Sequence, residues 1–381
     1  MKSLPAFLTL LSSAAAFAAD STVTVRNPLG TQREAATVEV ELKQLPAADP
    51  ATLHVIGADG NEVLCQTLDT DGDAYRTHDI LVFQTDLGPG ETKIFTVGSG
   101  AKRTYRKSDF KAFGRFNRER FDDFAWENDR IAHRTYGKAL ETWEGEPLAS
   151  STIDVWSKRT PKMVVNDWYL ADDYHADHGE GADFYSAGPT RGCGGGGIWA
   201  GEKLWTSRNF TDSNVLANGP VRLIFELTYP PFDVDGISVS ETKRITLDAG
   251  SQLNHITSTY KQFTKPGEKR ELTAAIGLKK VPGETVGTRK DIGAVWKWEP
   301  VASNAGSQGL AVLVAPDAFR GRVTDPLNHL LLTPVPENGV VESWAGFAWD
   351  KAGHIPDAAA WETYLTNFAA ALQAPLEVTV K

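Results

Sequence analysis

The chain has 381 residues and a formal net charge of −10, with two cysteines and 11 tryptophans. This acidic balance argues against a nucleic-acid backbone or an anionic membrane surface as the partner. The length permits either one domain or two.

The first residues predict a secretory signal peptide over residues 1–18. Lys2 supplies a positive charge, residues 7–17 are short and mostly apolar, and Ala16-Phe17-Ala18 is a small-x-small cleavage signal. No later window reaches the roughly 18 consecutive apolar residues of a membrane-spanning helix. We therefore expect a periplasmic or extracellular product without a membrane span.

The two cysteines, Cys65 and Cys193, would meet an oxidising compartment after export and could form a disulfide there. A chain of this length can also stabilise itself by burial alone. The sequence leaves the pairing open, and the alternative for Cys193 is a small residue packed in a glycine-rich turn.

Strand patterns dominate the rest of the chain. Residues 19–100 show short β-branched and apolar runs between turn signals, which indicates antiparallel sandwich strands, either as a small leader or as part of the main domain. Residues 101–146 have no clean period, and strand patterns then resume, so residues 101–381 are assigned to a main β-domain with one helix near residues 357–371. The expected fold class is mainly β: a large antiparallel β-sandwich with long functional loops and few helices. The expected strands lie at residues 23–25, 37–42, 53–56, 80–83, 94–97, 151–156, 221–229, 238–247, 252–260, 271–278, 309–314 and 376–380.

The segment over residues 172–197 concentrates groups that can do chemistry. It lacks the alternation of a half-buried strand and is rich in glycine, so we expect a long loop open to a ligand rather than a core strand. Imidazoles titrate near neutral pH, so His175 or His178 could act as a general acid or base, with Tyr174 or Tyr185 as the counterpart. The alternative is that both histidines only tie the loop to the sandwich.

The same histidines are also weak candidates for a divalent metal site. His175 and His178 are three residues apart, and Asp177 and Glu180 could complete the ligands. Gly179 argues against the regular helix that would aim both rings at one ion. No cofactor is therefore certain, and a divalent metal stays possible.

A second segment, over residues 119–137, mixes aromatic and hydrogen-bonding side chains in the way that sugar binding requires. Trp126, Asn128, Arg130 and Arg134 could hold an acidic sugar, or the apolar members could belong to a core strand. Tyr174, Arg191 and His354 are further candidates for substrate binding.

Four motifs stand out along the chain: Asn27-Pro28-Leu29, residues 123–130, Tyr174-His175-x-Asp177-His178-Gly179-Glu180-Gly181-x-Asp183-Phe184-Tyr185, and Arg191-Gly192-Cys193-Gly194-Gly195. Together they resemble a secreted bacterial family catalogued as domain of unknown function 4861, over essentially the whole mature chain. The resemblance implies a galactose-mutarotase-like supersandwich and a role in degrading acidic polysaccharides such as pectin and ulvan, with oligosaccharide dehydration as one activity. It implies no catalytic residues.

Elimination from a uronic acid would give these residues defined roles. A base removes the C5 proton, a cation neutralises the neighbouring carboxylate, and an acid protonates the leaving hydroxyl. We expect His175, His178 and Tyr185 as catalytic residues, and Arg130, Arg134 or Arg191 as the carboxylate clamp. A non-catalytic carbohydrate-binding protein, a sugar epimerase and a glycoside hydrolase with two carboxylates remain alternatives.

Overall fold

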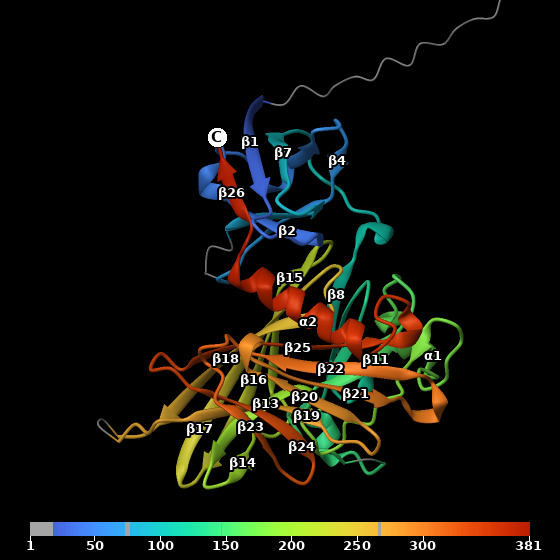
Figure 1. Cartoon of the computed structure of the whole chain (residues 1–381), viewed down its shortest axis with the longest axis vertical. Helices are drawn as coiled ribbons and strands as arrows, with labels where there is room; N and C mark the ends of the chain where they lie inside the picture. Colours follow the sequence, from blue (N-terminus) through green and yellow to red (C-terminus); the bar gives the residue numbers. More distant parts are fainter. Residues whose placement is uncertain (1–17, 73–76, 146, 266–267) are drawn as a thin grey trace, which may run out of the picture.

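The computed structural model describes residues 18–72, 77–145, 147–265 and 268–381. The first strands form a small β-sandwich above the main body (Figure 1). Its two sheets have the orders β26-β1-β7-β3-β4 and β2-β6-β5, and valine, leucine and phenylalanine side chains fill the space between them. The strands are β1 (Ala18–Arg26), β2 (Arg33–Glu41), β3 (Leu53–Gly57), β4 (Glu62–Val63), β5 (Cys65–Leu68), β6 (Ile80–Leu87) and β7 (Thr92–Ser99), with 3-10 turns at Leu42–Gln44 and Pro50–Thr52.

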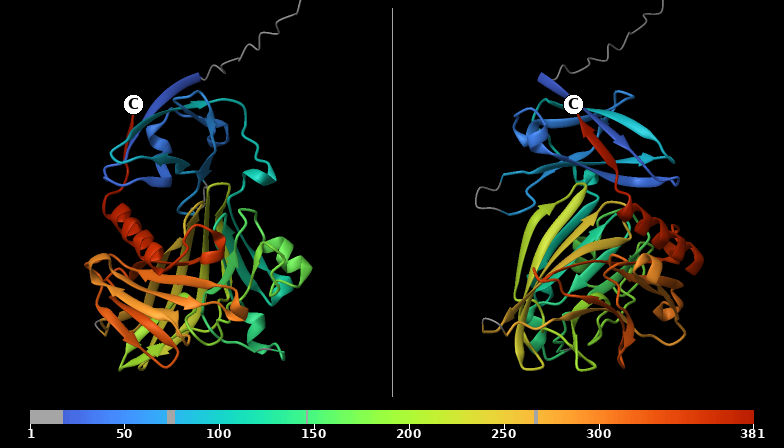
Figure 2. Two further views of the ribbon diagram at one scale, coloured as in Figure 1. Left: turned by 45° about the vertical axis from the view of Figure 1, so that its right-hand side comes forward. Right: turned by 60° about the vertical axis from the view of Figure 1, so that its left-hand side comes forward.

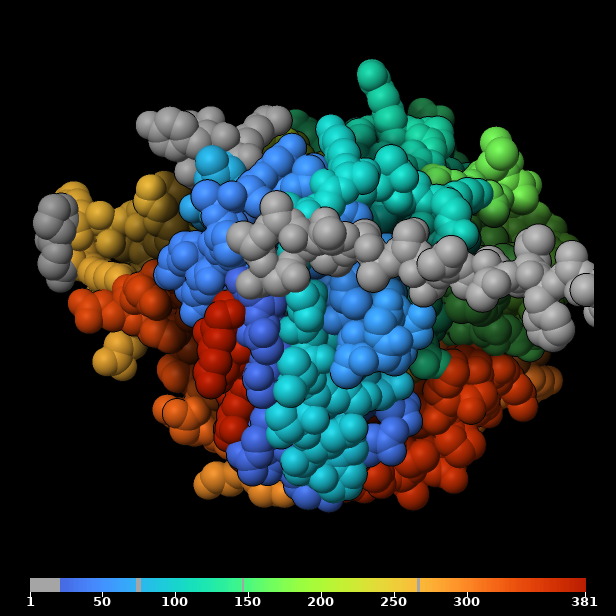
Figure 3. Space-filling view, turned by 90° about the horizontal axis from the view of Figure 1, so that it is seen from above, coloured from blue at the N-terminus to red at the C-terminus, as the bar shows by residue number. Residues whose placement is uncertain are grey.

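The last strand of the chain belongs to this small sandwich. β26 (Glu377–Val380) pairs antiparallel with β1, with Val380 opposite Val23. Seen from above, the red C-terminal strand lies beside the blue N-terminal strands (Figure 3). The sequence analysis assigned residues 376–380 to the main domain over residues 101–381. The hydrogen bonds between β26 and β1 instead make this strand part of the small sandwich.

Three antiparallel sheets form the main body (Figure 2). Their orders are β15-β16-β17-β18-β25-β22-β21-β20, β14-β13-β19-β24-β23 and β12-β11-β10-β9-β8, and one core contains side chains of all three. The mainly antiparallel β-fold with few helices is therefore confirmed. The strands are β8 (Ala112–Asn117), β9 (Asp123–Asn128), β10 (Ala132–Thr135), β11 (Asp154–Lys158), β12 (Gly181–Ala182), β13 (Cys193–Ala200), β14 (Lys203–Trp205), β15 (Asp212–Asn218), β16 (Arg222–Val234), β17 (Ile237–Asp248), β18 (Leu253–Phe263), β19 (Thr273–Lys279), β20 (Thr285–Arg289), β21 (Ala294–Pro300), β22 (Ser307–Leu313), β23 (Gly321–Thr324), β24 (Asn328–Pro334) and β25 (Val340–Trp349).

Two α-helices lie within the described ranges, and one of them was expected. α2 (Ala358–Gln373) begins at Asp357, whose side chain accepts a hydrogen bond from the backbone N–H of Ala360. It covers the outer face of β21, β22 and β25, where Trp361 is fully buried. The short α1 (Val165–Ala171) was not expected from the sequence. No helix in the described part of the chain is long and apolar enough to cross a membrane.

The glycine-rich segment corrects one expectation. Residues 172–192 are mostly loop, but Cys193–Ala200 is β13, and Cys193 to Ile198 are buried. A Cβ at Gly194 would lie 2.4 Å from the Cβ of Ala345, and one at Gly195 would lie 2.5 Å from the carbonyl oxygen of Arg191. The glycines therefore allow close packing of a core strand rather than access for a ligand.

Both cysteines are free and buried, so no disulfide joins them. Cys65 lies in the core of the small sandwich and Cys193 in the core of the main body. The signal peptide expected at residues 1–18 falls outside the described residues, apart from Ala18, where β1 begins.

Candidate functional site

The two histidines of the loop point to solvent. The His175 side chain is 68% exposed and its Nδ1 lies 3.1 Å from the carbonyl oxygen of Asp183. The His178 side chain is 72% exposed, and its Nε2 lies 2.9 Å from Asp173. Each ring faces one aspartate and solvent. The geometry therefore gives no support to the expected roles of His175 and His178 as base or acid.

A pocket of about 210 Å³ lies between α1 and this loop. Trp168, Tyr174 and His178 line it together with three carboxylates, Asp167, Asp173 and Glu180. The excess of negative charge disfavours an acidic sugar here.

Arg134 lies beneath the loop and is already occupied by carboxylates. Its guanidinium donates to Asp154 at 2.7 Å and to Asp183 at 2.9 Å, and it lies 3.9 Å from Asp123. Tyr174 accepts a hydrogen bond from Arg134 at 3.3 Å. Because the side chain of Arg134 is only 11% exposed, it holds the loop to β10 and has no free N–H for a substrate.

Four of the other predicted binding residues lie in three separate places. Trp126 is fully buried and its Nε1 donates to Asn254, so it is a core residue and not a platform for sugars. Asn128, also fully buried, holds the turn before Ile131 through its side-chain amide. Arg130 contacts His354 on the surface, and neither residue shares a hydrogen bond with Arg134.

Arg191 is also a structural residue. It is 3% exposed, and it donates to the hydroxyls of Ser150 at 2.8 Å and Ser151 at 2.9 Å. Burial lowers its pKa to about 10. Its guanidinium lies inside the sandwich, so the expected clamp has to be sought elsewhere.

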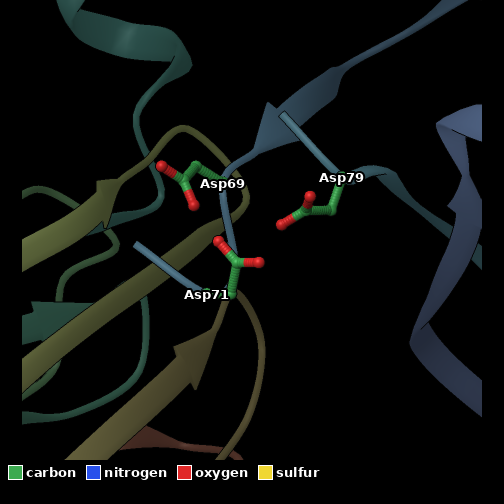
Figure 4. Close-up of side chains that lie close together, drawn as sticks. All are labelled: Asp69, Asp71 and Asp79. Carbon is green, nitrogen blue, oxygen red and sulfur yellow. The ribbon is translucent and has the colours of Figure 1, made fainter. Parts of the chain in front are cut away.

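The four metal candidates form no cluster. Asp177 pairs with Arg159, and Glu180 pairs with Lys162, while each histidine faces a different aspartate. In the described ranges, one group of three carboxylates does converge: Asp69, Asp71 and Asp79, between β5 and β6 (Figure 4). Asp69 accepts from the N–H of Gly72, and Asp79 accepts from Thr70, so both carboxylates order their own loop.

A buried group of charged side chains lies elsewhere, on the inner face of β21. We call it the Lys297 cluster. Lys297 is fully buried, and its ammonium donates to Glu284 at 2.9 Å and also contacts Glu299. Gln308 donates to the other oxygen of Glu299 at 2.7 Å. The members of the cluster are Tyr185, Lys279, Glu284, Lys297, Glu299 and His329.

His329 and Glu284 form a dyad within the cluster. Nε2 of His329 lies 2.6 Å from Glu284, whereas Nδ1 is buried and has no hydrogen-bond partner in the described structure. Burial lowers the pKa of His329, and Glu284 opposes this only in part. The imidazole is therefore neutral near pH 7, and the dyad leaves the Nδ1 lone pair available as a base.

Tyr185 and Lys279 complete the cluster. The Tyr185 hydroxyl is buried without a partner among the described residues, and burial raises its pKa well above the ordinary value. The Lys279 ammonium lies 5.1 Å from the centre of the Tyr185 ring. Burial lowers the pKa of Lys279, while Glu299 and Asp154 oppose the shift.

The two glutamates have opposite pKa shifts. Burial raises the pKa of Glu299. For Glu284, hydrogen bonds from His329 and Lys297 outweigh burial, so its pKa is lowered. Such a split between neighbouring carboxylates is a frequent property of functional sites.

Of the predicted catalytic residues, only Tyr185 lies in this cluster. Sequence reasoning missed Lys279, Glu284, Lys297, Glu299 and His329. The one available signal was the pair of charges at Lys297 and Glu299, which fall on one face of an otherwise apolar and aromatic strand.

Comparison with known proteins gives the family. A family model described as "Domain of unknown function (DUF4861)" matches residues 25–378. The chain belongs to the DUF4861 family. This confirms the resemblance seen in its motifs. A relative from Formosa agariphila, named "Uncharacterized protein P7", is 31% identical over 379 residues, covering 94% of this chain and 93% of the relative.

The DUF4861 chain also shares its fold with a solved structure of a protein in glycosyl hydrolase family 38 from Enterococcus faecalis. The TM-score is 0.52 at 11% identity, and the match covers 97% of this chain and 48% of the other. The chain thus spans about half the length of that protein. At this identity the likeness shows the fold and nothing further.

Proposed function

We propose that this DUF4861 protein is a secreted carbohydrate-active enzyme that acts on oligosaccharides containing uronic acid, by elimination at the Lys297 cluster. The observation that carries the proposal is that one cluster holds an unpaired imidazole nitrogen, an unpaired phenol and the half-buried ammonium of Lys279. These are the base, the acid and the carboxylate-neutralising cation that elimination next to a carboxylate requires.

Each group has a role that fits its environment. Nδ1 of His329 takes the C5 proton, and the electrons of the C5–H bond form the C4=C5 double bond. The C4–O bond breaks, and Tyr185 donates its proton so that water or a sugar alcohol leaves. The raised pKa of Tyr185 keeps the phenol protonated at neutral pH and suits a donor. We assign to Lys279, whose ammonium also donates to the carbonyl oxygen of Ser186, the neutralisation of the uronate carboxylate, which acidifies the C5–H bond.

We propose that the substrate reaches the cluster from the side of Lys279, which is its more exposed side. Lys279, Glu284 and Phe184 are half-buried, and Ser186 is exposed, whereas Lys297 and Glu299 lie below them. An acidic sugar approaching this side would meet the Lys279 ammonium first.

The test is absorbance in the ultraviolet, where a conjugated unsaturated uronate absorbs and its saturated parent does not. The mature protein is incubated with uronic-acid oligosaccharides, with and without chelator, and product mass distinguishes loss of water from chain cleavage. We expect Y185F to lower the rate by about 10²- to 10⁴-fold. Its stability should change little, because the lost hydroxyl makes no hydrogen bond within the described structure.

Tyr229 provides a matched control, since its hydroxyl is also buried and lies beside Lys243 and Glu241 in another part of the core. We expect Y229F to retain wild-type activity. Full activity in Y185F would overturn the role of Tyr185. Saturable binding without any absorbance change would favour a carbohydrate-binding protein instead.

The split between Glu299 and Glu284 favours one second candidate, a glycoside hydrolase. A carboxylic acid with a raised pKa can protonate a leaving oxygen, while an ionised carboxylate serves as nucleophile or base. Cleavage products that gain the mass of water and do not absorb would identify this reaction. E299Q would then abolish turnover.

A further inference from the structure

An arginine lies over an aromatic pair next to the Lys297 cluster. The guanidinium carbon of Arg159 is 5.3 Å from the centre of the Trp349 ring, and the Phe184 ring lies 5.7 Å from the same indole. We call these three side chains the Arg159 rim. Trp349 is buried, Phe184 is half-buried, and the Arg159 side chain is 32% exposed, so cation and phenyl ring form the outer layer.

The hydrogen bonds of Arg159 leave one side of the guanidinium free. Nε donates to the carbonyl oxygen of Gly179 at 3.1 Å, and Nη2 donates to Asp177. Nη1 has no partner in the part of the chain that the structure describes. In contrast, Arg134 and Arg191 direct their guanidinium groups into buried acceptors. Arg159 is therefore held in place by the loop and still offers N–H groups outward.

Two links through the backbone place the rim beside the Lys297 cluster. Trp349 is paired with Gln308 across β25 and β22, and Gln308 donates to Glu299. Phe184 directly precedes Tyr185 in the chain. A sugar chain bound at the cluster would thus have the rim as its next surface.

We propose that the Arg159 rim is a subsite for a second acidic sugar, adjoining the one that reacts. Nη1 of Arg159 binds its carboxylate, and the Phe184 ring covers the apolar face of the pyranose. This inference rests on the proposed function. It adds that the substrate is an oligomer with at least two uronic acids, and that the loop over residues 172–185 serves recognition by holding Arg159 through Asp177.

The test measures affinity apart from turnover. Isothermal titration of the Y185F protein with trigalacturonate and with galacturonate gives the gain from the additional sugars. We expect trigalacturonate to bind more tightly than the monomer. Adding R159Q should weaken trigalacturonate binding by about 10- to 100-fold, the value of a hydrogen bond to a charged group, with little change for the monomer. F184L should also weaken the binding of trigalacturonate while leaving the binding of galacturonate almost unchanged.

The matched control is R26Q. Arg26 is likewise a partly exposed arginine paired with a carboxylate, Glu377, but it lies in the small sandwich. We expect no change in either affinity. Equal affinity for trigalacturonate with and without R159Q would overturn the proposal that the Arg159 rim binds a second acidic sugar. Failure of both sugars to bind the unsubstituted and Y185F proteins would instead overturn the proposed substrate class.

Discussion

At the scale of single residues, a buried chain of hydrogen bonds fixes the protonation state of His133. Trp126 donates to Asn254, whose side-chain amide donates to Nε2 of His133, so Nδ1 must carry the proton that reaches the carbonyl oxygen of Asp154. The ring is fully buried between these groups. This arrangement accepts only the neutral imidazole.

The chain of bonds predicts a pH dependence of stability. Burial lowers the pKa of His133 to about 4, below its ordinary value of 6.5. The unfolded state therefore binds the proton first as pH falls, and the stability that His133 contributes is complete above pH 6.5 and lost towards pH 4. The term amounts to about 3 kcal/mol. Urea denaturation of the wild type and H133Q between pH 4 and 7.5 measures it as the difference between the two curves.

Asp123 provides a control of opposite sign. Burial raises its pKa to about 7, so the folded state retains a proton that the unfolded state releases, and stability falls as pH rises from about 4 to 7. D123N should therefore make stability rise more steeply with pH than in the wild type, whereas H133Q should flatten or invert the rise. Parallel curves for H133Q and the wild type would contradict the assignment.

Sequence reasoning at this scale identified polar residues but not their partners. Arg134 and Arg191 were expected to bind a substrate carboxylate because both carry a guanidinium group. In the structure, both guanidinium groups donate to buried acceptors that lie far away in the sequence. Tyr185 was chosen for its place in a motif, and its neighbours in the cluster come from β19, β21, β24 and the segment before β20. No local pattern records such contacts, because they form only when two sheets and the segments that carry Tyr185 and Glu284 pack together.

At the scale of elements, α2 packs on the outer face of the large sheet through three buried side chains, of which Trp361 is the largest; the others are Leu365 and Ala369. The Trp361 ring packs on Gly309, where an added Cβ would lie 2.5 Å from Cδ1 of the indole. We expect W361A to lower the free energy of unfolding by about 3–5 kcal/mol, the usual cost of emptying a large buried site. Urea midpoints measure the change. L372A, at an exposed position of the same helix, should change the free energy of unfolding by no more than about 0.5 kcal/mol. Equal losses in both variants would show that the indole contact does not account for the effect of W361A.

The elements predicted from sequence were those with one buried face. β16 and β17 alternate between apolar and polar positions and were expected, and so was α2. β13 was missed because Cys193–Ile198 are buried on both faces, and β9, where Asp123–Asn128 are buried on both faces as well, was left open between a core strand and a sugar-binding segment. Such strands show no alternation. Their polar and glycine residues, which suggested loops, are satisfied by tertiary hydrogen bonds or by close backbone contacts.

At the scale of the whole molecule, the C-terminal strand lies beside the N-terminal strand. α2 crosses beneath the small sandwich and leads into β26, which closes the sheet beside β1 (Figure 1). Val378 and Val380 pack on the core of the small sandwich. Thr22 and Lys381 also exchange two backbone hydrogen bonds, at 2.8 and 2.9 Å. The small sandwich is thus complete only when the C-terminus has been added, a dependence that period-2 patterns along the sequence cannot reveal.

Removal of residues 376–381 should therefore loosen the small sandwich before the main body. The deletion leaves β1 as an unpaired edge and uncovers part of a small core, whereas the main core keeps all its strands. We expect calorimetry to show an early transition separate from the main one, and limited proteolysis to cut first within residues 18–100. E377Q is the control, because it removes only the exposed pair with Arg26, worth less than about 1 kcal/mol. If the shortened chain melts in a single transition at the wild-type temperature, β26 adds no measurable stability to the small sandwich. If the early transition appears, the two ends of the chain stabilise the small sandwich together.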